Sequence, residues 1–178
     1  GANTVITACA GCFRTLKKQY PEKYGLLGDS SDAQIFHISQ FIANRLTKSS
    51  LLASNSKNIT VTYHDPCHLG RHVGVFEEPR AVLKLLPHVE LVEMPRNRDN
   101  AWCCGAGAGV KSEMKDWALE ISEERIREAL GLKDSLGRNI DFLVSTCPFC
   151  ERNLADARES LINKGEVEKD ELKVLDLV

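Results

Sequence analysis

The stretch IDFLVSTCPFCERNLADARESLINKG (residues 140–165) decides the fold. Its first part, residues 140–147, is an apolar, β-branched run that predicts a buried strand. A helix is predicted over 148–165, with Pro148 in its first turn and Gly165 after its last turn. A strand that leads directly into a helix, with Cys147 at the junction, is typical of an α/β fold.

The same alternation of strands and helices continues through the rest of the chain. The final stretch LKVLDLV (172–178) predicts either another strand or a helix. We therefore expect an α/β protein with a layered, largely parallel sheet and flanking helices. The other predicted strands are 4–9, 59–67 and 89–95, and the other predicted helices are 11–25, 33–48, 77–89 and 109–131.

Most of the cysteines follow predicted strands. Cys9, Cys67 and Cys147 lie just past the carboxyl ends of three strands, and Cys103 and Cys104 lie in the loop after a fourth. Open α/β sheets bind ligands outside the carboxyl ends of their strands. Cysteines far apart in the sequence are therefore expected to converge at one sheet edge.

An internal repeat divides the chain. The stretch VITACAGCFRTLKKQYPEKYG aligns with LVSTCPFCERNLADARESLINKG, so that Cys9 and Cys12 correspond to Cys147 and Cys150. We expect residues 1–48 to be the carboxyl-terminal part of a truncated first repeat, and residues 58–178 to be a complete second repeat. Both would form one compact unit, and Cys9 and Cys12 would belong to a second, incomplete metal site.

The composition narrows the classes of function. The net charge of −2 gives no electrostatic reason to expect nucleic acid as a partner. The chain contains no apolar run long enough to span a membrane, and its first residues do not resemble a secretory signal. The seven cysteines are odd in number and clustered, which favours metal or redox use in the reducing cytoplasm over a disulfide scaffold.

The complete cysteine set is C-x35-CC-x42-C-x2-C, starting at Cys67. Four thiolates would suffice for tetrahedral zinc or a cubane iron–sulfur cluster, and a fifth is surplus for either. An excess of soft thiolates favours iron–sulfur chemistry, and the glycines after Cys104 leave room for a bulky inorganic core. Zinc binding and inert buried cysteines remain the alternatives.

Three motifs carry a family resemblance. HDPCHLGR (64–71), WCCGAGAG (102–109) and STCPFCERNL (145–154) resemble the cysteine-rich CCG domain of the heterodisulfide reductase catalytic subunit and related Fe–S oxidoreductases. The resemblance implies a noncubane [4Fe–4S] cluster, and reduction at that cluster of a disulfide between two thiol coenzymes. The implied ligands are Cys67, Cys103, Cys104, Cys147 and Cys150.

Two other functions stay open. One is an Fe–S electron-relay subunit for a dehydrogenase of glycolate, lactate or glycerol 3-phosphate, and the other is a zinc-stabilised interaction module without redox activity. For the favoured function we expect further subunits as partners, such as a membrane cytochrome or a flavoprotein. Such a partner would hold the cytoplasmic protein at the membrane surface. A fragment prepared in air is expected to lack the cluster or to carry zinc.

Four residues near the motifs are candidates for indirect roles. His64 and His68 are expected to hydrogen-bond to loop carbonyls or carboxylates, or alternatively to a cysteine thiolate. Arg71 and Arg152 either partly neutralise an anionic cluster or substrate, or are ordinary surface arginines.

Overall fold

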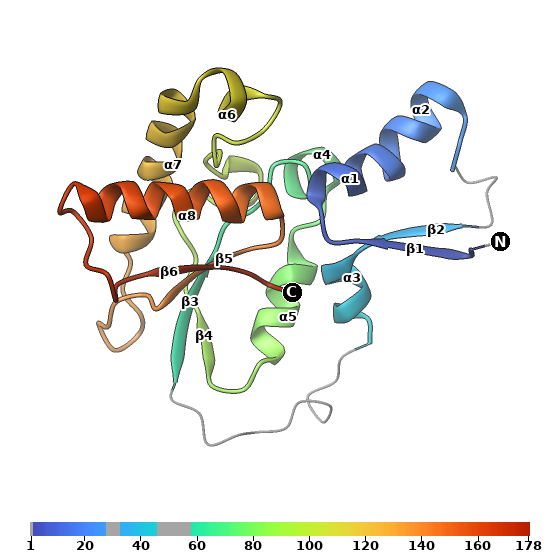
Figure 1. Cartoon of the computed structure of the whole chain (residues 1–178). Coiled ribbons are helices and arrows are strands. Elements are labelled where there is room, and N and C mark those ends of the chain that lie inside the picture. Colours follow the sequence, from blue (N-terminus) through green and yellow to red (C-terminus); the bar gives the residue numbers. More distant parts are fainter. Residues whose placement is uncertain (1, 28–32, 46–57) are drawn as a thin grey trace.

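The computed structural model describes residues 2–27, 33–45 and 58–178, and within them the α/β class is confirmed. The two sheets are parallel, one with the strand order β1-β2 and the other with the order β4-β3-β5-β6 (Figure 1). The strands are β1 (Thr4–Thr7), β2 (Gln34–His37), β3 (Ile59–Tyr63), β4 (Val89–Leu91), β5 (Phe142–Ser145) and β6 (Lys173–Asp176).

Helices cover both sheets. Helix α8 lies along β5 and β6 and packs against α7, while α3 packs against α5 (Figure 1). The helical segments are α1 (Ala10–Arg14), the π-helical turn η1 (Thr15–Gln19), α2 (Tyr20–Tyr24), α3 (Ile38–Ala43), α4 (Gly70–Val73), α5 (Glu77–Leu85), the 3-10 turn η3 (Arg98–Asn100), α6 (Val110–Glu113), α7 (Lys115–Leu130) and α8 (Pro148–Asn163).

The unit β5–α8 forms as its sequence predicts. Cys147 has an extended backbone, with φ −156° and ψ 119°, and is the N-cap residue of α8. Pro148 begins α8, where its missing N–H costs no helical hydrogen bond. Leu154, Ala157 and Leu161 recur at helical spacing and are fully buried, so one face of α8 packs into the core.

The prediction of a helix over residues 33–48 is wrong at its start. Residues Gln34–His37 form β2, which pairs in parallel with β1, and only Ile38–Ala43 are helical. Pairing with β1 decides the outcome, because a short apolar run fits either structure until a neighbour satisfies its backbone groups. The His37 side chain then caps α3 by accepting a hydrogen bond from the Ser39 N–H. Residues 46–48 of the predicted helix lie outside the described residues.

The long helix predicted over residues 109–131 is divided in two. Met114, with φ −132° and ψ 61°, has a non-helical backbone and separates α6 from α7. Met114 and Trp117 are more than half exposed. Helix α7 buries Ala118 and Ile126 instead.

One hydrophobic core spans both parts of the chain. It contains Ala10, Phe13 and Ile35 from the amino-terminal part together with Leu143 and Leu154 from the carboxyl-terminal part. The helix that starts at Ala10 is therefore packed directly beside the β5–α8 junction. The expected boundary between the two repeats, residues 49–57, lies outside the described residues.

Candidate metal centre

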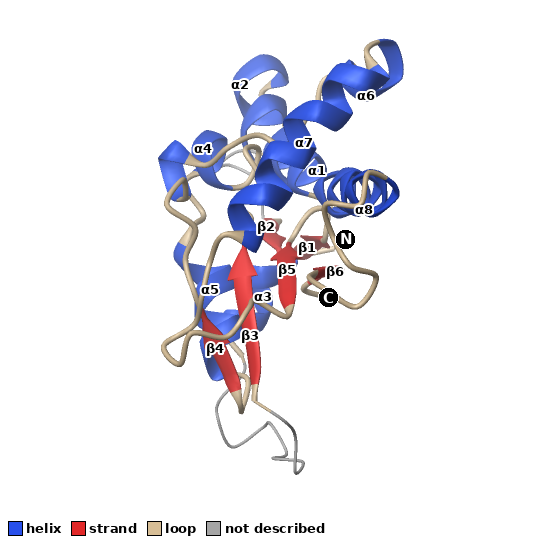
Figure 2. Ribbon diagram, turned by 90° about the vertical axis from the view of Figure 1, so that its left-hand side faces the viewer, coloured by secondary structure: helices blue, strands red, loops and turns tan. Residues whose placement is uncertain are grey.

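Five cysteines line one cavity of about 380 Å³ near the carboxyl ends of β3 and β5. Cys67 follows β3, whose arrowhead points toward the end of the molecule where α4 lies (Figure 2). Cys147 follows β5 and Cys150 sits in the first turn of α8. Cys103 and Cys104 lie in the loop between η3 and α6. The fold thus brings together all five cysteines that the sequence singled out.

The five thiols are free and interact with one another. All seven cysteines of the chain are unpaired, and the Sγ atoms of Cys104 and Cys150 lie 3.2 Å apart. Hydrogen bonds from the thiols of Cys104 and Cys67, together with the Gly105 N–H, lower the pKa of Cys103 to about 2. The same hydrogen bond raises the pKa of the donor Cys104 to about 12. These hydrogen bonds favour the thiolate form of Cys103 over that of Cys104.

A second thiolate is favoured at the start of α8. Hydrogen bonds from the Cys150 thiol and from the backbone N–H groups of Cys150, Phe149 and Ala10 lower the pKa of Cys147 to about 6, although burial opposes the shift. The Ala10 N–H comes from the amino-terminal part of the chain. That part therefore contributes directly to the electrostatics of the cavity.

Glycines let the cysteine loop approach α7 closely. Gly105 has φ +77°, and a Cβ atom there would lie 2.4 Å from the backbone oxygen of Ala118. The Asn153 amide of α8 donates hydrogen bonds to the carbonyls of Cys104 and Ala118, at 2.5 and 3.1 Å. Asn153 thus joins the loop, α7 and α8 at one point. In the sequence, Asn153 is marked only by its place one turn after Cys150.

Asp65, in the motif HDPC, supports the Cys67 turn. Its two carboxylate oxygens accept hydrogen bonds from the Arg80 guanidinium at 2.7 and 2.8 Å, and one of them also accepts the Arg98 N–H at 2.9 Å. Both Asp65 and Arg80 are buried. The carboxylate therefore ties the turn before Cys67 to α5 and to the segment that leads into Cys103.

His64 is a buried neutral imidazole beside the thiols. A ring nitrogen of His64 and the Sγ atoms of Cys104 and Cys150 all lie within 4.8 Å of one another. Burial, followed by the charge of Arg125, lowers the pKa of His64 to about 3. Arg125 Nε donates to His64 Nδ1 at 3.2 Å, so the proton of the neutral ring is on Nε2. The expected bond to a carbonyl or carboxylate is replaced by this contact with an arginine.

The other three residues with predicted indirect roles differ in how close they lie to the five-cysteine cavity. They are His68, Arg71 and Arg152. His68 lines the cavity, and its Nε2 lies 3.3 Å from Arg14 Nη1. Arg71 donates hydrogen bonds to the backbone carbonyls of Asp99 and Ala101. These bonds stabilise the segment before the cysteine pair. Arg152 is exposed on α8.

Cys9 and Cys12 are not among the residues that line the five-cysteine cavity. Cys12 is exposed, and Cys9 is half-buried. Burial raises the pKa of Cys9, with a smaller contribution from the charge of Cys147. The two cysteines thus border the cavity wall formed by Ala10 and Gly11 without entering it.

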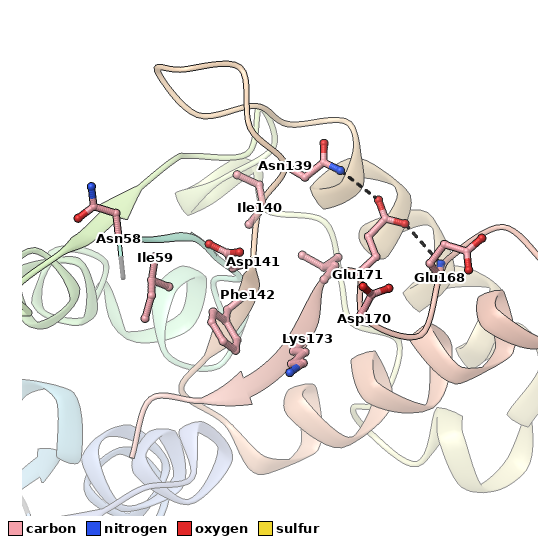
Figure 3. A pocket seen from close by; sticks show the side chains of 11 residues that line it. Asn58, Ile59, Asn139, Ile140, Asp141, Phe142, Glu168, Asp170, Glu171 and Lys173 are labelled. Carbon is pink, nitrogen blue, oxygen red and sulfur yellow. Dashed lines mark hydrogen bonds between the residues drawn. The ribbon is translucent and has the colours of Figure 1, made fainter. Parts of the chain in front are cut away.

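A larger cavity, of about 640 Å³, lies at the opposite end of the sheet, where β3, β5 and β6 begin (Figure 3). Its described lining includes neither cysteine nor histidine. Asp141 there accepts the Thr60 N–H at 2.8 Å, and Glu171 accepts the Asn139 amide at 3.5 Å. These contacts fasten loops to strands, so the smaller cavity is the candidate functional site.

The residues of the smaller cavity fit an iron–sulfur cluster. Thiolates are the ligands that such clusters require, and the lowered pKa values of Cys103 and Cys147 favour two of them at neutral pH. A Cβ atom at Gly107 would meet nothing within 4 Å, so open space remains beside the thiols. Tetrahedral zinc would use fewer sulfurs than the cavity offers.

The family model of the CCG cysteine-rich domain matches residues 61–155, more than half of the chain and all five cysteines of the cavity. The chain therefore belongs to the CCG domain family. The segment that carries Cys9 and Cys12 lies outside the matched range.

Curated relatives include oxidoreductase subunits. The chain is 47% identical over 175 residues to a subunit of the dihydromethanophenazine:CoB–CoM heterodisulfide reductase of Methanosarcina acetivorans, with 98% of this chain covered. It is 38% identical over 159 residues to a subunit of the fumarate reductase (CoM/CoB) of Methanothermobacter marburgensis, with 89% covered. It is 30% identical over 158 residues to the EtfAB:quinone oxidoreductase of Syntrophomonas wolfei, with 88% covered.

The chain spans only part of each relative: 40% of the heterodisulfide reductase subunit, 29% of the fumarate reductase subunit and 21% of the quinone oxidoreductase. Other relatives are described as iron–sulfur proteins. No helix within residues 2–27, 33–45 and 58–178 has the length and apolar character needed to cross a bilayer.

Proposed function

We propose that this chain is the cluster-binding part of a heterodisulfide-reductase-type oxidoreductase, which reduces a disulfide of two thiol coenzymes. The ligands of its noncubane [4Fe–4S] cluster are Cys67, Cys103, Cys104, Cys147 and Cys150. Such a cluster supplies single electrons and an iron atom with affinity for sulfur. The observation that carries the proposal is that five free thiols, one more than a cubane needs, line a single cavity.

Residues around the thiols prepare the cavity for this chemistry. The N–H groups of Ala10 and Gly105 donate hydrogen bonds to cysteine sulfurs, and a ring nitrogen of His64 lies within 4.8 Å of the Sγ atoms of Cys104 and Cys150. Hydrogen bonds to cluster sulfurs raise the reduction potential. Cys9 and Cys12 belong to a second, incomplete metal site.

The name of one relative supports the expected partners. The heterodisulfide reductase relative is by its name one subunit of an enzyme, and that name includes dihydromethanophenazine. We expect this chain to act within a similar assembly, in the cytoplasm, with electrons delivered by a membrane cytochrome or a flavoprotein. Such a partner holds the assembly at the membrane surface.

Anaerobic reconstitution tests the proposal. The reduced chain is loaded with iron and sulfide, and bound iron, bound sulfide and the paramagnetic signal after addition of a thiol to the oxidised cluster are measured. We expect about four irons and four sulfides per chain and a thiol-dependent signal. The Cys104→Ser variant should lose that signal and keep its fold, because Cys104 is one small side chain in a core that spans both parts of the chain. Cys12→Ser, on the exposed cysteine outside the cavity, is the matched control.

A Cys104→Ser variant with unchanged iron content and thiol-dependent signal would show that four ligands are enough. That result would favour electron relay for a flavin-dependent dehydrogenase of glycolate, lactate or glycerol 3-phosphate. A colourless protein that retains zinc and no iron would instead favour the interaction module.

A further inference from the structure

One buried amide holds the loop that carries the two adjacent cysteines. The side chain of Asn153, in α8, donates hydrogen bonds to the carbonyls of Cys104 and Ala118, and the residue is only 1% exposed. The backbone carbonyl of Asn153 accepts a hydrogen bond from the hydroxyl of Ser122, in α7, at 3.1 Å. Asn153 therefore connects the cysteine loop to α8 and to α7, which pack against each other (Figure 1).

The Asn153 amide satisfies both carbonyls in one orientation only. An asparagine side chain has two N–H donors on its nitrogen and acceptor lone pairs on its oxygen. The partners, the carbonyls of Cys104 and Ala118, are both acceptors, so the nitrogen faces them and both N–H groups are used. A side chain of similar size that lacks these N–H groups would leave the buried Cys104 carbonyl without this donor, which is unfavourable.

The same face of α8 also presents Cys150 to Cys104. Cys150 and Asn153 are three residues apart in α8, so their side chains lie on one face of the helix. The Sγ atoms of Cys104 and Cys150 lie 3.2 Å apart, and both residues are buried. Cys104 thus contacts α8 twice, through its carbonyl and through its thiol, and the first contact restricts where the thiol can lie.

The neighbouring cysteine of the pair is held by its own loop. Cys103 is exposed, and its Sγ accepts a hydrogen bond from the N–H of Gly105, two residues further along the chain. The two adjacent cysteines therefore have different supports, which are α8 for Cys104 and the loop itself for Cys103.

We propose that Asn153 is a positioning residue, which places the Cys104 thiol beside the Cys150 thiol before any cluster is bound. The amide acts through the carbonyl of Cys104. The inference rests on the proposed function for the use of both thiols as ligands, whereas their placement is a property of the metal-free chain. Two ligands that are already held on one helix lose less conformational entropy when a cluster binds.

The test compares two disulfides that share Cys150. The metal-free chain is equilibrated without oxygen in a mixture of glutathione and glutathione disulfide. One glutathione disulfide takes up two electrons and two protons from a pair of protein thiols and leaves as two thiols. Exchange between the two protein disulfides needs no oxidant: the Cys104 thiolate attacks Cys150 Sγ, the bond from Cys150 to Cys147 breaks, and Cys147 leaves as the thiolate. Alkylation after an acid quench, followed by mass spectrometry, gives the ratio of the Cys104–Cys150 disulfide to the Cys147–Cys150 disulfide.

We expect Asn153→Leu to lower this ratio about tenfold, because each lost hydrogen bond changes an equilibrium constant by a factor of about two to ten. Asn153→Asp, whose carboxylate has the same shape and donates no hydrogen bond, should lower it as well. The matched control is Leu161→Ala, which removes a fully buried side chain further along α8. This control should destabilise the chain and leave the ratio unchanged, because the ratio reports positions within the folded state.

An unchanged ratio in Asn153→Leu overturns the inference, and so does an equal decrease in Leu161→Ala or a native chain that forms no Cys104–Cys150 disulfide. If Asn153→Leu does not fold, Asn153→Ser provides the comparison and should also lower the ratio, because its shorter side chain has a single donor. Iron and sulfide content after reconstitution of the native chain is measured separately. A native chain that assembles no cluster refutes the proposed function, and the ratio still decides the role of Asn153.

Discussion

Replacing Arg80 by Met should destabilise the fold more than any exposed substitution on the same helix. Arg80 is fully buried and makes five hydrogen bonds, to both oxygens of Asp65, to both oxygens of Glu93 and to the Phe76 carbonyl. Met has a similar length and cannot donate any of them. The substitution leaves the Asp65 carboxylate buried without its cation.

Breaking a buried ion pair in this way costs about 3–5 kcal/mol. The total free energy of unfolding of a small domain is about 5–15 kcal/mol, so the loss is a large share of it. We would measure urea unfolding of the reduced, metal-free chain by circular dichroism. Lys84→Met, on the exposed side of α5, is the matched control and should change the free energy by less than about 0.5 kcal/mol. An Arg80→Met effect below about 1 kcal/mol would refute the argument.

The same substitution tests how the cysteines are held. Asp65 connects the Cys67 turn to Arg98, in the segment that leads into Cys103. We therefore expect the iron bound after reconstitution to fall in Arg80→Met even at temperatures where the chain remains folded. In a double-mutant cycle with Asp65→Asn, additive effects on stability would show that the pair does not act as a unit.

Two further substitutions test the cysteine loop and the buried histidine. Gly105→Ala should destabilise the chain by about 2–4 kcal/mol, because the new Cβ meets the Ala118 backbone oxygen and φ is +77°. Gly107→Ala, where a Cβ has open space, should cost less than about 1 kcal/mol, and equal effects in urea unfolding would contradict the argument. The pKa of His64 in the folded chain, about 3, is below that of the unfolded chain, so the unfolded state binds more protons between about pH 3 and 6.5. The protonation of His64 on unfolding should accordingly lower the free energy of unfolding by about 2 kcal/mol when the pH drops from 7 to 5. The His64→Asn variant should lack this decrease. An unchanged pH dependence in His64→Asn would show that the imidazole is not held neutral.

The sequence by itself determined the class of fold and the five cysteines of the cavity. Both depend on local signals: an apolar strand, a cysteine where it ends, and a helix bounded by Pro148 and Gly165. Parallel strands end at one edge, so cysteines that follow β3 and β5 meet there without further information. The family motifs lie in the same segments and match the range 61–155. The division into two repeats stays a prediction.

The tertiary structure alone decided which polar groups support the cavity. Arg80 with Asp65, Arg125 with His64, and Arg14 with His68 join positions that are 15, 61 and 54 residues apart. No local pattern marks such pairs, because the partner of a buried charge is set by how the helices pack and not by neighbours in the sequence.

The same reason explains the wrong predictions. Residues 34–37 have an apolar pattern that fits a helix or a strand. Pairing with the neighbouring strand β1 makes the strand the more stable of the two. Trp117 carries a side chain that usually prefers the core, yet it is more than half exposed at the start of α7. Local sequence specifies which structures a segment can adopt, and the free energy of packing against distant segments selects one of them.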